Sequence, residues 1–254
     1  MNHPDNGKGG SRTLYAGLCL VLLWTLLHFA IGSSIIPSPW RTFLNFISIF
    51  PGTLAPHLLV SFGRIAAALL ISLLFGSAIG LWIGLNTRAD HWITPIVYLL
   101  YPLPKIAFLP ILMILFGLGN APKIILIVII IIFQIIIAAR DGVREIPAEL
   151  FHSVCSLGLG KGEVYRHLIL PAVMPKIITA VRISIGVSIS VLFFGESFAT
   201  TYGIGYFIMN SWLMVNYVEM FSGILALSLL GLILFSLVDW LERRTCRWNR
   251  IGKT

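Results

Sequence analysis

Three of the charged side chains that interrupt or border the long apolar runs of this sequence could support chemistry on a solute. Lys105 lies within the apolar run 93–118, Arg182 lies within the run 177–195, and Glu196 directly follows that second run. A charge at membrane depth is costly, so it marks a path for a solute or ion unless it pairs with another group. The two cations would suit an anionic solute. We therefore treat Lys105, Arg182 and Glu196 as candidate pathway residues.

Two of these charges also have a structural interpretation, which the sequence favours. Lys105 lies in a proline-rich stretch, where the missing backbone N–H groups leave carbonyl groups that a lysine can cap. It could instead form a structural ion pair. Arg182 comes six residues after Lys176, which is about 9 Å along a helix. Its long side chain can therefore reach the cytoplasmic surface.

The sequence contains no group of residues with the spacing of a catalytic or metal-binding site. His28 is alone in its apolar run, and His57 and His91 are predicted to lie at opposite faces of the membrane. The three cysteines have neither metal-ligand spacing nor a disulfide pattern, and no GxxxxGK[ST] phosphate-binding loop occurs. We therefore expect no catalytic residue, no metal site and no cofactor bound by this chain.

The elements that must position these residues are helices long enough to cross a membrane. The chain has 254 residues, of which 57% are hydrophobic and 11% charged, as is typical of a polytopic membrane protein. About 20 apolar residues cross a bilayer as a helix. We predict an all-α membrane protein whose six transmembrane helices lie at about 14–32, 58–85, 93–118, 122–139, 177–195 and 219–238. The segment 37–56 is predicted to lie outside the membrane.

Prolines and glycines give some of these runs a distinct character. Four prolines lie in the run 93–118, so this span is predicted to be broken. Gly76, Gly80 and Gly84 recur at every fourth residue, which lets two helices approach closely in lipid. We interpret this spacing as packing within one chain rather than as a dimer seam. The run 122–139 is almost entirely Ile and Val, which predicts a lipid-facing helix.

The distribution of Lys and Arg predicts the orientation of the chain. With both tails (1–13 and 241–254) in the cytoplasm, thirteen Lys and Arg residues fall on the inner side, and Arg41, Arg64 and Lys123 on the outer side. Arg64 is expected to reach the surface with its long side chain. The net charge of +8 then forms a positive inner rim facing anionic headgroups, so we expect no nucleic-acid partner.

The longest polar interruption, residues 140–175, is predicted to be a cytoplasmic loop with two short helices. The first helix would carry one apolar stripe, made of Leu150, Phe151, Val154 and Leu157. Gly158 suits its end. A second helical run, 163–170, is predicted to stop at Pro171. The stripe could bind a soluble partner or pack against the ends of the chain's own spans, and the pattern leaves both alternatives open.

This loop resembles the EAA loop of ABC-transporter permeases, in which Glu-Ala-Ala precedes a glycine and a later Leu-Pro pair. Gly158 and Leu170–Pro171 match that spacing, and Leu168 stands at the Ile position, whereas His152–Val154 replace Glu-Ala-Ala. The resemblance implies contact with an ATPase through a set of loop residues, namely Leu150, Phe151, His152, Ser153, Val154, Cys155, Leu157, Gly158, Leu170 and Pro171.

Further motifs resemble the permeases of the nitrate, sulfonate and taurine group. They are the third-span stretch YPLPKIAFLP at 101–110 with FGLG at 116–119, the outer segment SIIPSP at 34–39, the glycine turn within 195–205, and the exit DWLERR at 239–244. Several separate motifs in the right order are more specific than the loop alone. On these motifs the chain is identified as a member of that permease family.

The resemblance implies a MetI-like ABC importer permease fold in a bacterial inner membrane, with the permease domain at 14–240 and the coupling loop at 140–175. The implied partners are a second copy of the chain, two cytoplasmic ABC ATPase subunits that use the ATP, an extracytoplasmic substrate-binding protein and the lipid bilayer. The implied solute is a small anion such as a sulfonate, taurine, nitrate or bicarbonate. A pyrimidine precursor or another small organic solute is the alternative, and a secondary transporter or a non-transporting scaffold is a more distant one.

Overall fold

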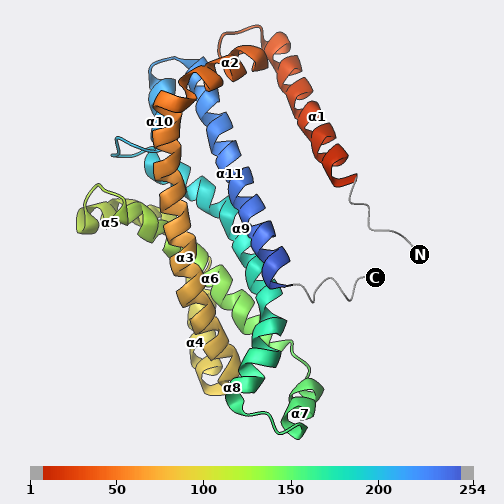
Figure 1. The fold of residues 1–254 in the computed structure, drawn as a ribbon. Coiled ribbons are helices and arrows are strands. Elements are labelled where there is room, and N and C mark those ends of the chain that lie inside the picture. The colour runs from red at the N-terminus through yellow and green to blue at the C-terminus, as the bar shows by residue number, and fades with distance from the viewer. Residues whose placement is uncertain (1–7, 247–254) are drawn as a thin grey trace.

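The computed structural model describes residues 8–246, and every regular element in this range is helical. In chain order the helices are α1 (Lys8–Ile31), α2 (Pro39–Ile49), the π-helical turn η1 (Phe50–Leu54), α3 (Ala55–Leu85), α4 (Thr87–Leu100), the 3-10 turn η2 (Lys105–Phe108), α5 (Leu109–Phe116), α6 (Ala121–Arg144), α7 (Ala148–Ser156), α8 (Lys161–Val164), the π-helical turn η3 (Tyr165–Ile169), α9 (Leu170–Glu196), α10 (Ile204–Leu213) and α11 (Tyr217–Thr245). Figure 1 shows them as an elongated bundle.

Three helices, α3, α6 and α9, pack along one another and form the main core (Figure 1). Ile65 on α3, Ile131 on α6 and Ile185 on α9 are fully buried members of this cluster. The prediction that 122–139 faces lipid is therefore wrong. This run is apolar nearly all round because it is the central helix, which packs against α3 and α9.

The glycines of α3 bring it close to α6, as the sequence predicted. A Cβ on Gly80 would lie 2.4 Å from the carbonyl oxygen of Ile136, and one on Gly84 would lie 2.8 Å from Cβ of Val143. Real Cβ atoms do not approach other atoms this closely, so the contact requires glycine. The glycine spacing serves packing within one chain.

The segment 37–56, for which the sequence predicted only a place outside the membrane, is mostly helical. Helix α2 continues through the π-helical turn into α3, so that Pro39–Leu85 forms one helical stretch of 47 residues. Within the turn, the N–H of Ala55 bonds to the carbonyl oxygen of Phe50. This wider turn accommodates Pro51, which has no N–H to donate, without ending the helix.

The third predicted span is broken, as its prolines indicated. Helix α4 and the pair η2–α5 meet at residues 101–104 and are bent by 80° relative to each other. In Figure 1, α5 projects sideways from the bundle at this bend. Pro95 lies inside α4 and does not interrupt it.

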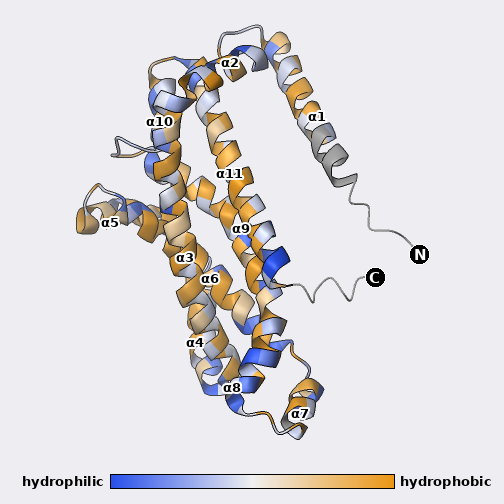
Figure 2. Ribbon diagram, in the orientation of Figure 1, coloured by the Kyte–Doolittle hydropathy of each residue, from blue (hydrophilic) through white to orange (hydrophobic). Residues whose placement is uncertain are grey.

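Within residues 8–246, four helices are long and apolar enough to cross a membrane, and the bent pair α4/α5 would make a fifth. The apolar part of α1, Tyr15–Ile31, is shorter than these four. Figure 2 shows the apolar middle sections of the long helices and polar residues near the ends of α4 and α8. The model thus supports an all-helical membrane protein with four or five apolar spans.

Helix α1 stands apart from the bundle in Figure 1 and joins it near the start of α2. The indole N–H of Trp24 donates to the carbonyl oxygen of Pro37 at 3.1 Å, and the Trp24 ring stacks on Phe221 of α11 with centroids 5.4 Å apart. His28 contacts the carbonyl oxygen of Ile36 through Nδ1 at 2.6 Å. These contacts fix the α1–α2 turn.

Candidate functional site

The predicted loop helix is α7, which lies at one end of the molecule (Figure 1). Its apolar stripe is divided between two environments. Phe151 is half-buried and packs against the main core together with Ile146. Leu150 and Leu157 are 46% and 78% exposed. Part of the stripe therefore packs on the chain's own spans, and the other part is free to meet a partner.

The polar face of α7 and the glycine turn after it also have defined structure. His152 and Ser153 are exposed, and the Ser153 hydroxyl donates to the carbonyl oxygen of Glu149 at 2.8 Å. Gly158 has a φ of +76°, a left-handed conformation that favours glycine. The predicted helix–glycine–helix arrangement is present. The side chain of Cys155 lies outside the described part of the structure.

The second loop helix does not end at Pro171, which corrects the sequence prediction. Helix α8 continues through η3 into α9, so Lys161–Glu196 is one helical stretch of 36 residues. Within the π-helical turn, the N–H of Leu170 bonds to the carbonyl oxygen of Tyr165. The bulge shifts the hydrogen-bond register before Pro171, so proline enters a first helical turn, where its missing N–H does no harm.

Ion pairs join the helices of the bundle near this loop, between residues that no local sequence pattern relates. Asp90 on α4 accepts a hydrogen bond from Nε of Arg140 at 2.6 Å and also pairs with Arg144. Lys176 on α9 pairs with Glu145 at the end of α6. These contacts join α4, α6 and α9 at the end of the bundle that carries α7.

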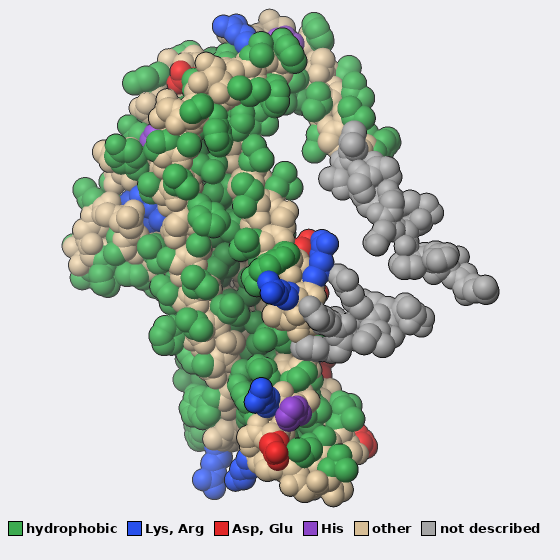
Figure 3. Space-filling model, in the orientation of Figure 1, with side chains coloured by type: hydrophobic (Ala, Val, Ile, Leu, Met, Phe, Trp, Pro, Cys, Tyr) green, Lys and Arg blue, Asp and Glu red, His purple; other side chains and the backbone are tan. Residues whose placement is uncertain are grey.

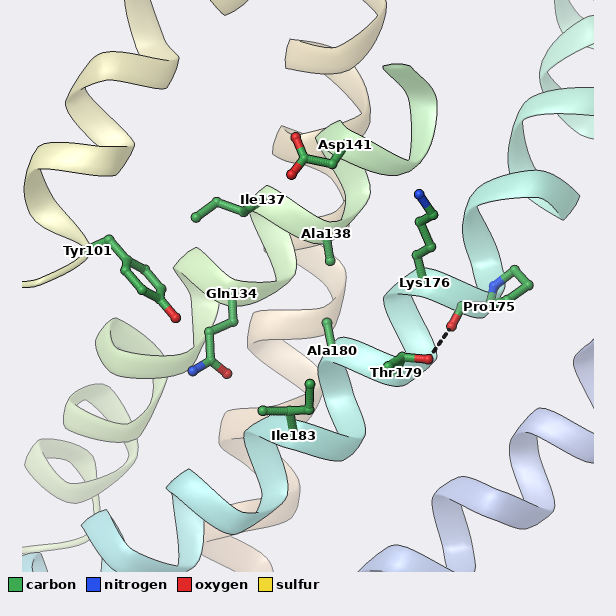
Figure 4. Close-up of a pocket in the computed structure, with 10 residues that line it drawn as sticks. All are labelled: Tyr101, Gln134, Ile137, Ala138, Asp141, Pro175, Lys176, Thr179, Ala180 and Ile183. Atoms are coloured by element: carbon green, nitrogen blue, oxygen red, sulfur yellow. Dashed lines mark hydrogen bonds between the residues drawn. The ribbon is translucent and has the colours of Figure 1, made fainter. Parts of the chain in front are cut away.

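A hollow of about 450 Å³ lies between α6, α9 and the end of α4 (Figure 4). Its lining residues are Tyr101, Gln134, Ile137, Ala138, Asp141, Pro175, Lys176, Thr179, Ala180 and Ile183. Figure 4 shows Gln134 and Asp141 on α6, and Lys176 and Thr179 on the neighbouring helix α9. Gln134 accepts a hydrogen bond from the Ser184 hydroxyl at 2.9 Å. The hollow thus places several polar groups among apolar helices.

Lys105 and Arg182 occupy structural positions beside this hollow rather than in its lining. The Lys105 ammonium group donates to the carbonyl oxygen of Tyr101 at 2.7 Å and lies 4.7 Å from the centre of the Phe133 ring. It caps a carbonyl at the proline break, as the structural interpretation predicted. Arg182 pairs with Asp239 at 2.6 Å and with Glu242, and so joins α9 to α11.

Glu196, the third candidate, is buried at the opposite end of α9. It accepts hydrogen bonds from Arg64 Nη1 at 2.6 Å, from the Ser61 hydroxyl at 2.8 Å and from the N–H of Gly205 at 2.8 Å. The expectation that Arg64 reaches the surface is therefore wrong, because its guanidinium group turns inward to this carboxylate. The only indication of the Arg64–Glu196 pair in the sequence is that two opposite charges lie within or beside apolar runs.

Lys123 was also expected at the outer surface, but it is 1% exposed. Its ammonium group donates to the carbonyl oxygens of Leu118 and Gly119, each at 3.2 Å. Both residues lie in the turn between α5 and α6, outside the two helices. The positive charge therefore lies inside the protein, close to the Arg64–Glu196 pair.

The remaining chemistry of the described residues is limited. Between residues 8 and 246, His, Cys, Asp and Glu form no cluster of three or more that could hold a metal ion. Cys246, which follows α11, is buried, and burial raises the pKa of its thiol. A thiol of raised pKa is a weak nucleophile at neutral pH.

Comparison with known proteins places this arrangement in context. Residues 72–247 match the model of the family described as "binding-protein-dependent transport system inner membrane component". The taurine transport system permease protein TauC of Escherichia coli (strain K12) is 30% identical over 247 residues, covering 93% of this chain and 90% of that protein. The putative aliphatic sulfonates transport permease protein SsuC of Bacillus subtilis (strain 168) is 27% identical, covering 95% and 88%.

The fold also resembles a solved structure. A chain of the MetNI methionine ABC transporter, in an inward-facing conformation, superimposes with a TM-score of 0.58 at 20% identity. The match covers 74% of this chain and 96% of that chain. At this identity the likeness establishes the shared fold, which agrees with the MetI-like expectation.

Proposed function

Because this chain belongs to the family of binding-protein-dependent transport system inner membrane components, and is a permease component of an ABC importer, we propose that its solute is a small organic anion of the sulfonate class, such as taurine. The named solutes of its relatives TauC and SsuC support this class. A pyrimidine precursor or another small organic solute is the alternative within the same importer class. We propose further that ATP hydrolysis takes place on a separate ATPase subunit and that this chain binds no cofactor.

One observation supports a coupling role for α7 above the others. A single helical stretch runs from the glycine turn beside α7 to Glu196, and its residues Lys176 and Thr179 line the hollow of Figure 4. A hydrogen-bonded helix moves as a rigid body. A displacement of α7 by a docked ATPase would therefore reach the hollow directly. We assign the exposed Leu150 and Leu157 to the ATPase contact.

A second copy of the chain is proposed because the hollow holds a polar side chain within a membrane span. Gln134, in the predicted span 122–139, is part of its lining, and polar groups in a span are costly where they face lipid. Two copies that face each other would enclose such groups and form a pathway between them. Helix α1, which stands apart from its own bundle in Figure 1, leaves room for a neighbouring chain.

The proposed orientation places α7 in the cytoplasm and both termini on that side, with α1 as the first of six spans. Figure 3 shows Lys and Arg side chains at the lower end of the molecule and beside the C-terminal end of α11, with fewer on the upper part, and apolar side chains cover much of the rest. This bias supports a cytoplasmic lower end. The substrate-binding protein would then deliver solute at the α2–α10 end.

Purification of the tagged chain from its native membrane in mild detergent tests this function. We expect an ATP-hydrolysing subunit to co-purify, and cells that carry the chain to accumulate radiolabelled taurine in an energy-dependent manner. Leu157→Glu should reduce the co-purified ATPase by about tenfold or more, because an apolar anchor in an interface contributes ~2 kcal/mol. Glu149→Gln, at an exposed residue of α7 outside the assigned contact set, is the control. A chain that runs alone and moves solute in vesicles without ATP would instead be a secondary transporter.

A further inference from the structure

A second hollow, of about 600 Å³, lies at the other end of the bundle between the start of α6 and the loop before α10. Its lining residues are Val60, Arg64, Leu118, Gly119, Asn120, Ala199, Thr200, Thr201 and Tyr202. It shares no lining residue with the hollow of Figure 4. In the proposed orientation it opens on the extracytoplasmic side, where solute arrives.

The charges around this second hollow do not cancel. Arg64 and Lys123 are cations, and within residues 8–246 Glu196 is the one carboxylate that pairs with either of them. A Cβ on Gly195 would lie 3.7 Å from Cγ of Lys123, so the lysine stem packs beside the residue that precedes Glu196. Two positive charges and one negative charge leave one positive charge in surplus. The carbonyl groups that solvate Lys123 are neutral and do not remove it.

The hydrogen-bonding groups in the wall also favour an anion. Asn120 Oδ1 accepts from both Nε and Nη2 of Arg64, at 2.9 and 2.7 Å. Its side-chain NH₂ group, an exposed donor, makes no hydrogen bond to any residue of the described chain. The exposed hydroxyl of Thr201 is a further donor in the lining. A sulfonate offers three oxygen acceptors and one negative charge, which matches these two donors and the one surplus positive charge behind them.

We propose that this hollow is an anion-binding site, which receives the sulfonate or carboxylate group of the solute on the extracytoplasmic side. Arg64, held by Glu196 and Asn120, supplies a fixed positive charge. Lys123 behind it supplies the second positive charge, which the single carboxylate of Glu196 does not balance. The anion contacts the Asn120 amide and the Thr201 hydroxyl at the mouth. The identity of the ligand rests on the proposed importer function, whereas the anion preference rests on the charges alone.

The electrostatic preference can be measured at a single reporter thiol in the full chain in nanodiscs of zwitterionic lipid. The three native cysteines are replaced (Cys19→Ala, Cys155→Ser, Cys246→Ala), and Thr201→Cys is introduced. Reaction rates are measured with an anionic reagent, sulfonatoethyl methanethiosulfonate, and a cationic one, trimethylammonioethyl methanethiosulfonate. Each rate is normalised to that of free mercaptoethanol. We expect the anionic reagent to react about tenfold faster than the cationic one, because a charged cleft concentrates counter-ions.

Asn120→Asp is the decisive variant, since it keeps the oxygen that accepts from Arg64 and cancels the surplus charge. It should bring the rate ratio to about one. Lys123→Met removes the same charge in another way and serves if Asn120→Asp does not fold. Arg41→Gln removes an exposed cation of α2 and should leave the ratio unchanged. Equal rates in the parent protein, or a ratio that survives both charge-cancelling variants, would overturn the proposal.

Protection by a small ligand tests binding itself. Methanesulfonate should slow modification of the reporter thiol in a saturable manner, and dimethyl sulfone, its neutral counterpart of similar shape, should not. Equal effects of the two would exclude an anion site. Taurine uptake by the same chain is measured separately. Loss of uptake with the anion preference intact would contradict the importer function but not this site, and uptake without any anion preference would contradict only the site.

Discussion

Arg64 and Glu196 form a buried ion pair that joins α3 to α9, with 2.6 Å between Nη1 and Oε1 and side-chain exposures of 5% and 0%. Glu196 also accepts from Ser61 and from the N–H of Gly205, and Arg64 also donates to Asn120 and to the carbonyl oxygen of Tyr202. A buried charge is tolerated when a partner and hydrogen bonds replace its water. The pair therefore fixes the relative position of two core helices beside the proposed anion site.

Removal of one member of this pair should destabilise the protein strongly. Glu196→Gln leaves the Arg64 charge without its partner, and such single changes in buried pairs cost about 3–5 kcal/mol. The double variant Arg64→Met/Glu196→Met should recover part of this loss, because neither charge then remains unpaired. Thermal unfolding in detergent, followed for the parent, both single variants and the double variant, measures the coupling. Additive losses would show that the two residues act independently.

Gly203 should not tolerate alanine. Its φ is +134°, and a Cβ there would lie 2.3 Å from Cδ of Glu196, so the side chain would collide with the ion pair. We expect Gly203→Ala to lower the melting temperature by several degrees, since about 1 kcal/mol shifts it by 2–4 °C in a chain of this size. Gly63→Ala is the control, because a Cβ at Gly63 meets nothing within 4 Å. Equal melting temperatures for the two variants would contradict this account.

Gly158→Val should uncouple the ATPase while the protein stays inserted and folded. The left-handed φ of +76° at Gly158 sets the turn from α7 to α8, and a β-branched residue there is strained. The turn would change its path and move α7 from its docking position. Substrate-stimulated ATP hydrolysis is the measurement, and Gly162→Val, at a glycine with open space around it, is the control. Full stimulation in the Gly158 variant would remove the role given to this glycine.

Lys105→Gln distinguishes a structural cap from a pathway contact. Lys105 donates to the carbonyl oxygen of Tyr101, and glutamine can donate to the same acceptor without the charge. If the cap is its role, the variant should keep its uptake KM for taurine and lose about 1 kcal/mol of stability at most. A KM raised severalfold, with the melting temperature unchanged, would indicate instead that the lysine charge contacts the anion.

The sequence by itself determined the class of the protein and the positions of its proline break and its glycine turn. Apolar runs of about 20 residues predict membrane helices. Proline and glycine act on the backbone at their own positions. The prolines between α4 and α5 therefore predicted the break in the third span, and Gly158 predicted the turn after α7. The α3 glycines likewise predicted a close helix contact. The loop and third-span motifs predicted the family, which the comparisons confirmed.

Only the tertiary structure decided which charges meet and which helix is central. Arg64 and Glu196 are 132 residues apart in the sequence, so no local pattern relates them. A run of Ile and Val does not distinguish lipid from protein as its surroundings, because both are apolar, and α6 was therefore misplaced. Pro171 was misjudged for a related reason. Whether a proline ends a helix depends on the hydrogen-bond register before it, and here a π-helical turn sets that register.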